Sequence, residues 1–346
     1  MDSAATDDRY VSTLEVLADE NSGREVIVEI IPELFSGAWR LLSYEVLGVH
    51  RKFGRCLVFC RISYRDGKDR RTHPAELVAK PYKSHKSNRG ARALRALQLL
   101  REVGFQPPSR YLVPRPYGYS SKHNILVQEK ISGTQWADFL GSDERDVSVP
   151  SEQAADWLVR LQGSTVVVGE DRSEDVALPR RMARELIAAY PQCAPLEPVA
   201  GWLAKSLNSE GASLVLSHGD YHPKNIFLGP GYTAVIDLDH LGQREPAFDV
   251  GYAIGQLLIM SYFRMGGFAP GAHAALSFWR RYEHGGAAEW SRVAAHVART
   301  FLQSLHYELC VIKNGRVELI PVWTHLIEEF LGSKGPETLE DLIRHS

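Results

Sequence analysis

The sequence has few cysteines and no long apolar run. None of its four cysteines lies in a CxxC pair, which argues against a disulfide framework and predicts reduced thiols in a cytoplasmic protein. The most apolar stretch, residues 250–263, is too short to span a bilayer and contains Gln256, so no membrane partner is expected. The cysteines are Cys56, Cys60, Cys193 and Cys310.

The chain also lacks an excess of charge of either sign. Its 40 Lys and Arg residues against 42 Asp and Glu residues give a net charge of −2, so nucleic acid is not an expected partner. With 346 residues, of which 44% are hydrophobic, the chain is long enough for two domains. The first ten residues, MDSAATDDRY, are acidic and polar and are not expected to form a signal peptide. The sequence leaves the oligomeric state open.

One stretch, residues 214–249, combines three short apolar runs with a dense polar loop: LVLSHGDYHPKNIFLGPGYTAVIDLDHLGQREPAFD. The runs read as strands, and the Gly-Pro-Gly at 229–231 predicts a turn. The third run ends in Asp237 and Asp239, which is unusual because unpaired buried charge is unfavourable. The pattern therefore predicts a metal or proton-transfer site at the end of these strands. The runs are residues 214–216, 226–228 and 234–236.

Three residues of this stretch have the chemistry that phosphoryl transfer needs. Asp220 lies in the polar loop and suits a base that accepts a hydroxyl proton. Asn225 offers a neutral oxygen and Asp237 an anionic one, and Mg²⁺ prefers oxygen ligands that it shares with substrate phosphates. Together they predict a positioned hydroxyl next to a metal-bound phosphate.

Two other readings of the same residues stay open. His218 and His222 have the i, i+4 spacing of a helical zinc pair, with His240 as a third ligand, but Pro223 follows at once and disfavours a helix. Asp239 suits either a second carboxylate beside the metal or an ordinary turn residue.

The motif HGDYHPKN, followed twelve residues later by the first aspartate of IDLDH and then by REPAFDVG, resembles the signature of the aminoglycoside phosphotransferase and choline kinase-like family. The resemblance implies ATP and Mg²⁺ as cofactors and a small-molecule hydroxyl as acceptor. It implies that Asp220 is the catalytic base and that Asn225 and Asp237 are the magnesium ligands. It further implies that Asp249 braces the catalytic loop and that His218 holds its backbone.

The N-terminal part reads as an antiparallel meander. Apolar or alternating runs at 41–49, 56–64 and 76–82 are separated by charged, glycine-containing turns. The last run places Lys80 near its end, and in a kinase-like domain such a lysine reaches the nucleotide phosphates. Without the 214–249 stretch, an ordinary lysine at a strand end would be the preferred interpretation.

A hinge is expected after the apolar run 125–127. By the resemblance, Gln128, Glu129 and Ile131 form the segment whose backbone would hydrogen-bond adenine. The resemblance then divides the chain into an N-lobe of residues 1–131 and a C-lobe of residues 132–346. The implied fold class is α+β, a bilobal protein-kinase-like fold with a small antiparallel-sheet N-lobe and a mainly helical C-lobe.

Apolar periodicity predicts a helix from Ser87 to about Val103, ended by Gly104, and a further helix with Ser151 as its N-cap. The first of these helices has a basic face, which reads either as a solvated surface or as an attractor for phosphate. Further helices are predicted at residues 172–189, 196–208, 247–262, 271–285, 287–312, 320–332 and 336–344.

The sequence departs from the family pattern in one place. Kinase-like folds pair the strand lysine with a helix glutamate, but no acidic residue occurs between Lys80 and Arg101. The sequence therefore leaves the orientation of Lys80 open: another acid could pair with it, or turnover could be slow or lost. We expect replacement of Gly90 by Glu to supply a partner for Lys80 and to stabilise the helix.

The sequence as a whole predicts an ATP–Mg²⁺-dependent kinase that phosphorylates a hydroxyl of a small molecule. The acceptor classes considered are sugars, amino alcohols, aminoglycoside-like compounds and natural products. The missing glutamate favours an alternative, a nucleotide-binding pseudokinase with a regulatory or scaffold role. A protein kinase is disfavoured because the HRD, DFG and APE motifs are absent.

Overall fold

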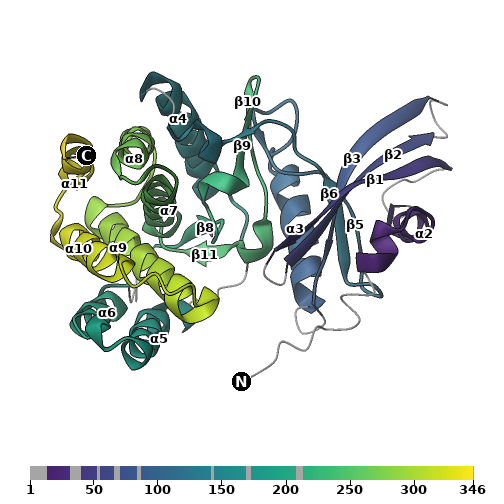
Figure 1. Ribbon diagram of the computed structural model, residues 1–346. Helices are drawn as coiled ribbons and strands as arrows, with labels where there is room; N and C mark the ends of the chain where they lie inside the picture. The colour runs from purple at the N-terminus through teal and green to yellow at the C-terminus, as the bar shows by residue number, and fades with distance from the viewer. Residues whose placement is uncertain are drawn as a thin grey trace. The chain divides into compact units, whose positions relative to one another are not determined.

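The chain forms two compact units in the computed structural model (Figure 1). Unit 1 comprises Met1–Ser132 and Ala234–Asp239, and unit 2 comprises Gly133–Thr233 and His240–Ser346. The short segment 234–239 thus belongs to unit 1, although its chain neighbours on both sides belong to unit 2. The structure describes residues 14–31, 40–52, 55–65, 71–83, 87–141, 144–168, 173–207 and 213–345.

Unit 1 is built on a five-stranded antiparallel sheet with the strand order β1-β2-β3-β6-β5. Its first three strands form the predicted meander, which confirms that expectation, while parts of the turns between them lie outside the described residues. The strands of unit 1 are β1 (Arg40–Lys52), β2 (Arg55–Arg65), β3 (Thr72–Pro81), the short β4 (Tyr111–Leu112), β5 (Pro116–Ser120) and β6 (Ile125–Glu129).

Two helices cover opposite faces of this sheet, α2 (Glu20–Ile30) on one face and α3 (Ser87–Glu102) on the other (Figure 1). Side chains of β3 alternate between the faces, as the strand period of two requires. Leu77 and Ala79 join the buried cluster that α2 covers, so Val78 and Lys80 point to the side of α3. The alternation therefore directs Lys80 away from the α2 core.

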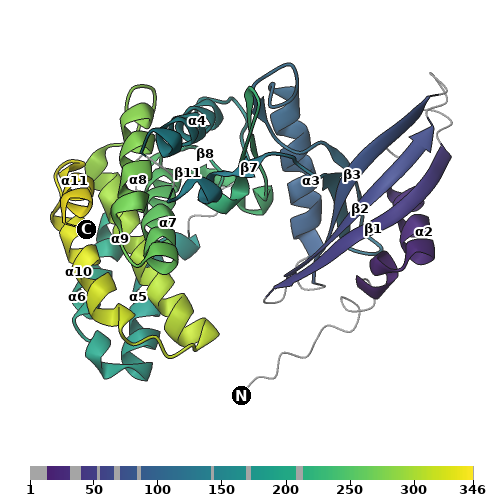
Figure 2. The same cartoon turned by 45° about the horizontal axis from the view of Figure 1, so that its top comes forward.

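Unit 2 is mainly helical, and its apolar helix α7 packs against α8 and α9 in the middle of the unit (Figure 2). Trp323 of α10 contacts the rings of Tyr262 and Phe301 and closes one end of this core. The helices are α4 (Glu144–Gln162), α5 (Ser173–Ala189), α6 (Leu196–Ser206), α7 (Ala247–Met265), α8 (Ala269–Tyr282), α9 (Trp290–His306), α10 (Leu319–Gly332) and α11 (Glu337–Arg344).

Short strands carry the polar loop of the 214–249 stretch. In unit 2, β8 (Val215–Ser217) pairs with β11 (Gly242–Arg244), and β7 (Thr134–Gln135) pairs with β9 (Ile226–Gly229). The glycine turn leads from β9 into β10 (Tyr232–Val235), with Gly231 at a φ of +79°. The strands predicted at 214–216, 226–228 and 234–236 are thereby confirmed within one or two residues.

Two local predictions differ from the structure. Ser151 is no N-cap, because α4 begins at Glu144 and continues through Pro150; the Ser151 hydroxyl instead donates to the carbonyl of Val147, one turn earlier. The helix predicted at 287–312 begins only at Trp290, and its last six residues, Tyr307–Ile312, form a π-helix.

The α+β, protein-kinase-like fold class is confirmed, with an antiparallel sheet in unit 1 and mostly helices in unit 2. The hinge near residue 131 stays a prediction. Within the described ranges, every helix is too short or too polar to cross a membrane.

Candidate active site

The polar loop that contains Asp220 begins directly after β8. Pairing with β11 holds that strand, with Ser217 opposite Gly242. Residues 218–222 are not helical, and the short 3₁₀ turn Pro223–Asn225 leads from the loop into β9. The strands thus fix both ends of the loop within unit 2.

The carboxylate of Asp249 accepts two hydrogen bonds from the backbone of this loop. Its side chain is fully buried near the start of α7, where Oδ2 accepts a hydrogen bond from the His218 N–H at 2.7 Å and Oδ1 one from the Gly219 N–H at 2.9 Å. Hydrogen bonds to a carboxylate are stronger than neutral ones, and the helix N-terminus also favours the charge. These contacts confirm the bracing expected of Asp249.

The backbone conformation of the loop requires Gly219 and is held by a hydrogen bond to the His218 side chain. Gly219 has a φ of +81°, and a Cβ there would meet the carbonyl oxygen of His240 and, at 2.9 Å, Nη1 of Arg244. His218 is buried and its Nδ1 accepts from the N–H of Asp220 at 3.2 Å, which confirms that it holds the loop backbone. Tyr221 is also buried and stacks on Trp157 with 5.7 Å between ring centroids.

The Asp220 carboxylate lies between two side chains that the sequence did not single out for this purpose. Tyr252 of α7 donates its hydroxyl to Oδ1 at 3.0 Å. Nε2 of His222 lies 3.8 Å from Oδ2, while its Nδ1 accepts from the N–H of Lys224, so His222 also shapes the loop. The two contacts fix the orientation of Asp220 and leave Oδ2 the less restrained oxygen.

One hydrogen bond orients the side-chain amide of Asn225. Its side chain is buried, and Nδ2 donates to the main-chain carbonyl of Asp220 at 3.0 Å. This hydrogen bond uses the donor end of the amide, so Oδ1 is the end that a cation would bind. Asp220 and Asn225 are thereby brought together within unit 2.

The zinc alternative loses its basis in the structure. His218 and His222 do not lie on a helix, so their i, i+4 spacing does not place them on one face. Both Nδ1 atoms accept hydrogen bonds from the loop backbone. Among the described residues, no three His, Cys, Asp or Glu side chains converge on a metal-sized site.

Lys80 has two carboxylate partners, which answers the question that the missing helix glutamate left open. In unit 1, Nζ of Lys80 lies 2.6 Å from Oδ1 of Asp237 and 2.9 Å from Oδ1 of Asp239. Burial by itself lowers the pKa of Lys80, but the two carboxylates outweigh it and the net shift is upward. The ammonium group is therefore held by acids that lie far along the chain, not by the neighbouring helix.

Asp237 and Asp239 occupy different backbone environments. Asp237 has a φ of +65°, a left-handed conformation that is uncommon outside glycine and often found at functional sites. Asp239 lies in the short 3₁₀ turn Leu238–His240 and accepts a hydrogen bond from the Tyr82 hydroxyl at 2.9 Å. Asp239 is therefore more than an ordinary turn residue.

The expectation for Gly90 is wrong. Gly90 is buried in α3, and a Cβ at this position would lie within 2.9 Å of the Tyr119 ring and 3.0 Å of the Tyr82 ring. Asn124 holds both residues, because its side chain accepts from the Tyr119 hydroxyl and donates to the main-chain carbonyl of Tyr82. Two aromatic rings thus fill the space that a glutamate side chain would need.

The segment expected to bind adenine follows the end of β6. Gln128 pairs with Val78 of β3 in the sheet register. The N–H of Glu129 donates to the carbonyl of Arg115 at 2.8 Å and is therefore not available to a ligand. The N–H of Ile131 has no backbone acceptor among the described residues.

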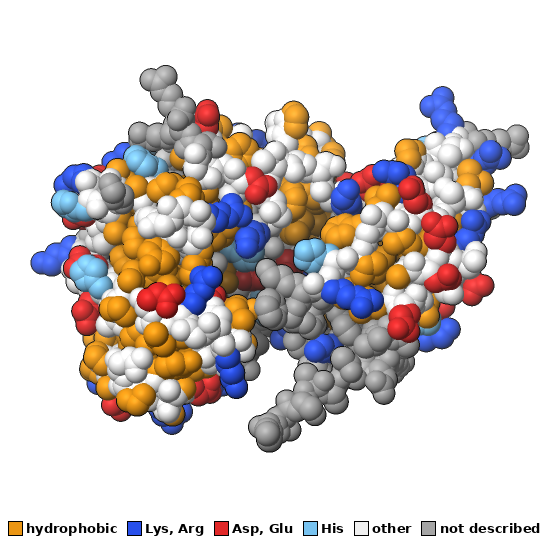
Figure 3. All heavy atoms as spheres, viewed as in Figure 1, with side chains coloured by type: hydrophobic (Ala, Val, Ile, Leu, Met, Phe, Trp, Pro, Cys, Tyr) orange, Lys and Arg blue, Asp and Glu red, His pale blue; other side chains and the backbone are white. Residues whose placement is uncertain are grey.

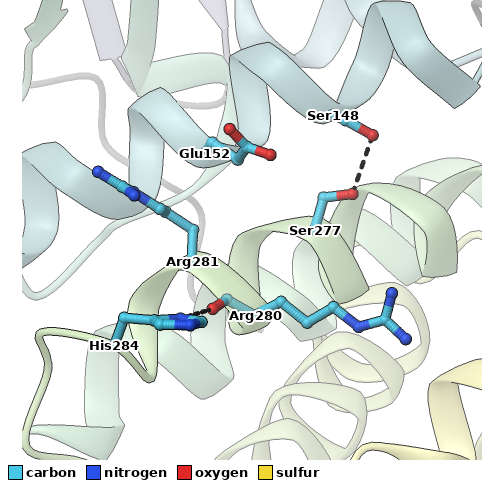
Figure 4. Close-up of a pocket in the computed structure, with 6 residues that line it drawn as sticks. All are labelled: Ser148, Glu152, Ser277, Arg280, Arg281 and His284. Atoms are coloured by element: carbon cyan, nitrogen blue, oxygen red, sulfur yellow. Dashed lines mark hydrogen bonds between the residues drawn. The ribbon is translucent and has the colours of Figure 1, made fainter.

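A cavity of about 410 Å³ lies between α4 and α8, and none of the predicted site residues lines it (Figure 4). Ser148 and Ser277 contact each other across it at 3.1 Å. Its two arginines each bind a carboxylate, Arg280 that of Glu340 and Arg281 that of Asp156. The cavity is therefore separate from the candidate active site.

Sequence reasoning missed Tyr252, Tyr82 and Asn124. One sequence signal exists for Tyr252, which follows Asp249 by three residues and so lies on the same side of α7. For Tyr82 and Asn124 no local pattern distinguishes them from other residues at strand ends.

Comparison with known proteins identifies the family of this chain. The sequence model of the phosphotransferase enzyme family (APH) matches residues 61–296, more than half of the chain. No curated protein sequence matches significantly.

Solved structures share the fold at low identity. A choline/ethanolamine kinase family protein from Mesorhizobium loti is 14% identical with a TM-score of 0.54, covering 94% of this chain and 99% of its own. Choline kinase LicA from Streptococcus pneumoniae is 16% identical with a TM-score of 0.51, covering 94% and 97%. Amicoumacin kinase hAmiN, in complex with AMP-PNP, Ca²⁺ and Ami, is 12% identical with a TM-score of 0.56, covering 92% and 95%. The family match over residues 61–296 establishes that the chain belongs to the phosphotransferase enzyme family, and these structures share its fold.

Proposed function

We propose that the protein is an ATP- and Mg²⁺-dependent kinase that transfers the γ-phosphate of ATP to a hydroxyl group of a small molecule. The observation that carries this proposal is the Asp220 carboxylate, presented on a loop whose backbone Asp249 anchors and whose orientation Tyr252 fixes. A carboxylate held in this way can orient an acceptor hydroxyl and take its proton. Phosphoryl transfer needs little other covalent chemistry from the protein.

Asn225 and Asp237 are the proposed magnesium ligands. Asn225 directs its amide oxygen away from its own hydrogen bond, and Asp237 supplies an anionic oxygen. Oxygen ligands of this kind suit Mg²⁺, which keeps several waters and binds substrate phosphates in addition. The metal would neutralise charge on the transferring phosphate. The complex of the related fold in hAmiN contains AMP-PNP and Ca²⁺, which supports a nucleotide and a divalent cation here.

Lys80 and the hinge segment are the proposed nucleotide contacts. The Lys80 ammonium remains charged beside its two carboxylates and would contact the phosphates. The carbonyl of Glu129 and the N–H of Ile131 would hydrogen-bond the adenine, while Gln128 holds the strand in register. These proposed contacts use backbone groups and the Lys80 ammonium, so they are the same for every acceptor.

The acceptor is proposed to be a small molecule that is not strongly cationic, such as a sugar, an amino alcohol or a natural-product intermediate. Residues 250–346 contain nine Lys or Arg and nine Asp or Glu residues. On the face that Figure 3 shows, acidic and basic side chains of the described part of unit 2 are interspersed. A pocket for a polycationic aminoglycoside should be rich in acids, since charge complementarity supports recognition.

The pseudokinase alternative rested on the missing helix glutamate. Because Lys80 has two carboxylates within 3 Å, this absence no longer argues against turnover. Asp220, Asn225 and Asp237 are also all present, so we favour an active enzyme.

The proposal is tested by incubating the protein with Mg-ATP and a panel of acceptors. We expect ADP formation that depends on one class of acceptor, and a product that is heavier by one phosphate. Asp220→Asn should lower kcat by about 10²- to 10⁴-fold while nucleotide binding stays intact. Asp138→Asn, at an exposed position of the same unit, is the matched control and should keep full activity.

Two outcomes would reject the proposal. Full turnover in Asp220→Asn with an authentic acceptor would remove Asp220 from the mechanism. Mg-ATP binding without any acceptor-dependent ADP formation across all classes would favour the pseudokinase alternative.

A further inference from the structure

The helix that normally supplies a partner for the strand lysine has no room for one in this protein. Helix α3 carries no acidic residue before Glu102, near its end. Gly90, where a glutamate was expected, is packed against the rings of Tyr82 and Tyr119. The function that a helix glutamate performs in kinase-like folds must therefore come from another element.

Two carboxylates from the 234–239 segment contact Lys80 instead. The side chains of Lys80, Asp237 and Asp239 are only 15%, 16% and 11% exposed, so water screens them weakly. The three side chains together carry one positive and two negative charges. The three side chains therefore have a net negative charge, which favours the approach of a cation.

The hydrogen bonds distinguish the two acids. Oδ1 of Asp239 contacts both the Lys80 ammonium and the Tyr82 hydroxyl, each at 2.9 Å. Asn124 in turn holds the backbone of Tyr82 through its main-chain carbonyl and side-chain amide. Asp239 is thus fixed by the core of unit 1, whereas Asp237 has the strained backbone and the position of the proposed metal ligand.

We propose that Asp239 is the positioning partner of Lys80, in place of the absent helix glutamate, so that Asp237 can bind the metal. This inference rests on the proposed nucleotide site. If Asp237 were the only partner, the metal and Lys80 would compete for its carboxylate. When Asp237 binds the metal, Asp239 still provides a negative charge beside the Lys80 ammonium. The ammonium therefore stays directed toward the phosphates.

The first test measures the pair in the protein without nucleotide or metal. Asp239→Asn keeps an oxygen that accepts from Tyr82 but removes the charge, and Lys80→Met removes the cation. We expect the effects of the two changes on the unfolding equilibrium to be non-additive, because each variant loses the same interaction. Additive effects would overturn the pairing.

The second test measures nucleotide affinity by calorimetry with and without Mg²⁺. Asp239→Asn should weaken ATP binding about tenfold under both conditions, because Lys80 loses its orientation. Asp237→Asn, the matched variant, should remove mainly the gain in affinity that Mg²⁺ provides. If Asp239→Asn removes the Mg²⁺ effect as Asp237→Asn does, Asp239 is a metal ligand and the proposal fails. Unchanged affinity in Asp239→Asn would equally reject it.

A milder variant controls for the case in which Asp239→Asn fails to fold. Tyr82→Phe keeps both charges and the ring beside Gly90 but removes the hydroxyl that orients Asp239. We expect a smaller loss of ATP affinity in the same direction, and no loss would contradict the proposal. Failure of the wild-type protein to bind ATP would reject the proposed function and with it the nucleotide role of Asp239, while the unfolding measurement would still report the Lys80–Asp239 pair.

Discussion

The hydroxyl of Tyr252 donates a hydrogen bond to Oδ1 of Asp220 over 3.0 Å. Tyr252 lies three residues after Asp249 on α7, so one helix both anchors the loop backbone and orients the side chain that the loop presents. Tyr252 and Gln256, one turn apart, are the only residues of α7 before Tyr262 that are not buried. The orientation of the Asp220 carboxylate therefore depends on α7 as well as on its own loop.

We expect Tyr252→Phe to lower kcat about tenfold with little change in the KM for ATP. The variant removes one hydrogen bond of the Asp220 carboxylate and leaves the ring that packs on His222 at 6.4 Å. Asp220 then samples rotamers that do not face the acceptor. Steady-state kinetics decide this, with Tyr262→Phe on the same helix as the matched control. A change confined to KM would assign Tyr252 to ligand binding instead.

Asp249→Asn should lower the free energy of unfolding by about 2–3 kcal/mol. Asp249 is fully buried and accepts two backbone N–H groups, and an asparagine has one acceptor oxygen and must direct its amide N–H₂ toward a donor. Denaturant unfolding measures the loss. Asp341→Asn, at an exposed position on α11, should change stability by less than about 0.5 kcal/mol. Equal stability of Asp249→Asn and wild type would show that the brace is dispensable.

Gly90→Ala should destabilise the protein by about 1–3 kcal/mol, and Gly90→Glu by more. Helix propensity alone predicts a gain of about 1 kcal/mol, but the new Cβ would overlap the rings of Tyr119 and Tyr82. Gly201→Ala is the matched control, because Gly201 lies inside α6 with nothing within 4 Å of its Cβ position. Thermal unfolding should show opposite signs for the two variants, and a stabilised Gly90→Ala would contradict the packing.

Stability should fall as the pH drops from 7.5 to 5, in part because of His296. Its buried imidazole contacts Glu245 at 2.6 Å, and burial lowers its pKa below 6.5 despite that contact. The unfolded chain therefore binds a proton below about pH 6.5 that the folded protein excludes, which favours unfolding by at most roughly 1.4 kcal/mol per pH unit.

The measurement for His296 is denaturant unfolding at several pH values. His296→Gln should flatten the dependence between pH 7.5 and 5, because the amide does not titrate. His325→Gln, at an exposed position on α10, should leave the dependence unchanged. A wild-type slope that survives in His296→Gln would exclude this residue as its source. The pKa of Glu245 is also lowered, because His296 and Arg292 outweigh its burial. The stability that the ionised Glu245 contributes is lost only below its ordinary pKa of 4.5.

Much of the fold could be predicted from the sequence because its patterns are local. The run 76–82 predicts a strand, which the structure confirms as β3, and in that strand Lys80 faces away from Leu77 and Ala79. Helical spacing predicted α3 from Ser87 to within one residue of its observed end. These periodicities follow from backbone geometry, so they can be recognised from residues that are close together in the sequence.

Local patterns failed where a tertiary contact outweighed them. Ser151 looks like an N-cap, yet α4 continues through Pro150, and the Ser151 hydroxyl accepts from the Trp136 indole in the core. Gly90 looks replaceable on helix propensity, yet two rings close on it. In both cases packing against distant residues contributes more than the local preference does.

The sequence by itself determined the candidate residues for the proposed chemistry, because the motif from His218 to Asp249 is continuous and has a characteristic spacing. Only the tertiary structure decided which acids contact Lys80. Asp237 and Asp239 are 157 and 159 positions away from it, and no local period relates a strand of the N-terminal sheet to a turn after β10. Their contact depends on the fold bringing the 234–239 segment into unit 1, where burial makes the opposite charges attract strongly.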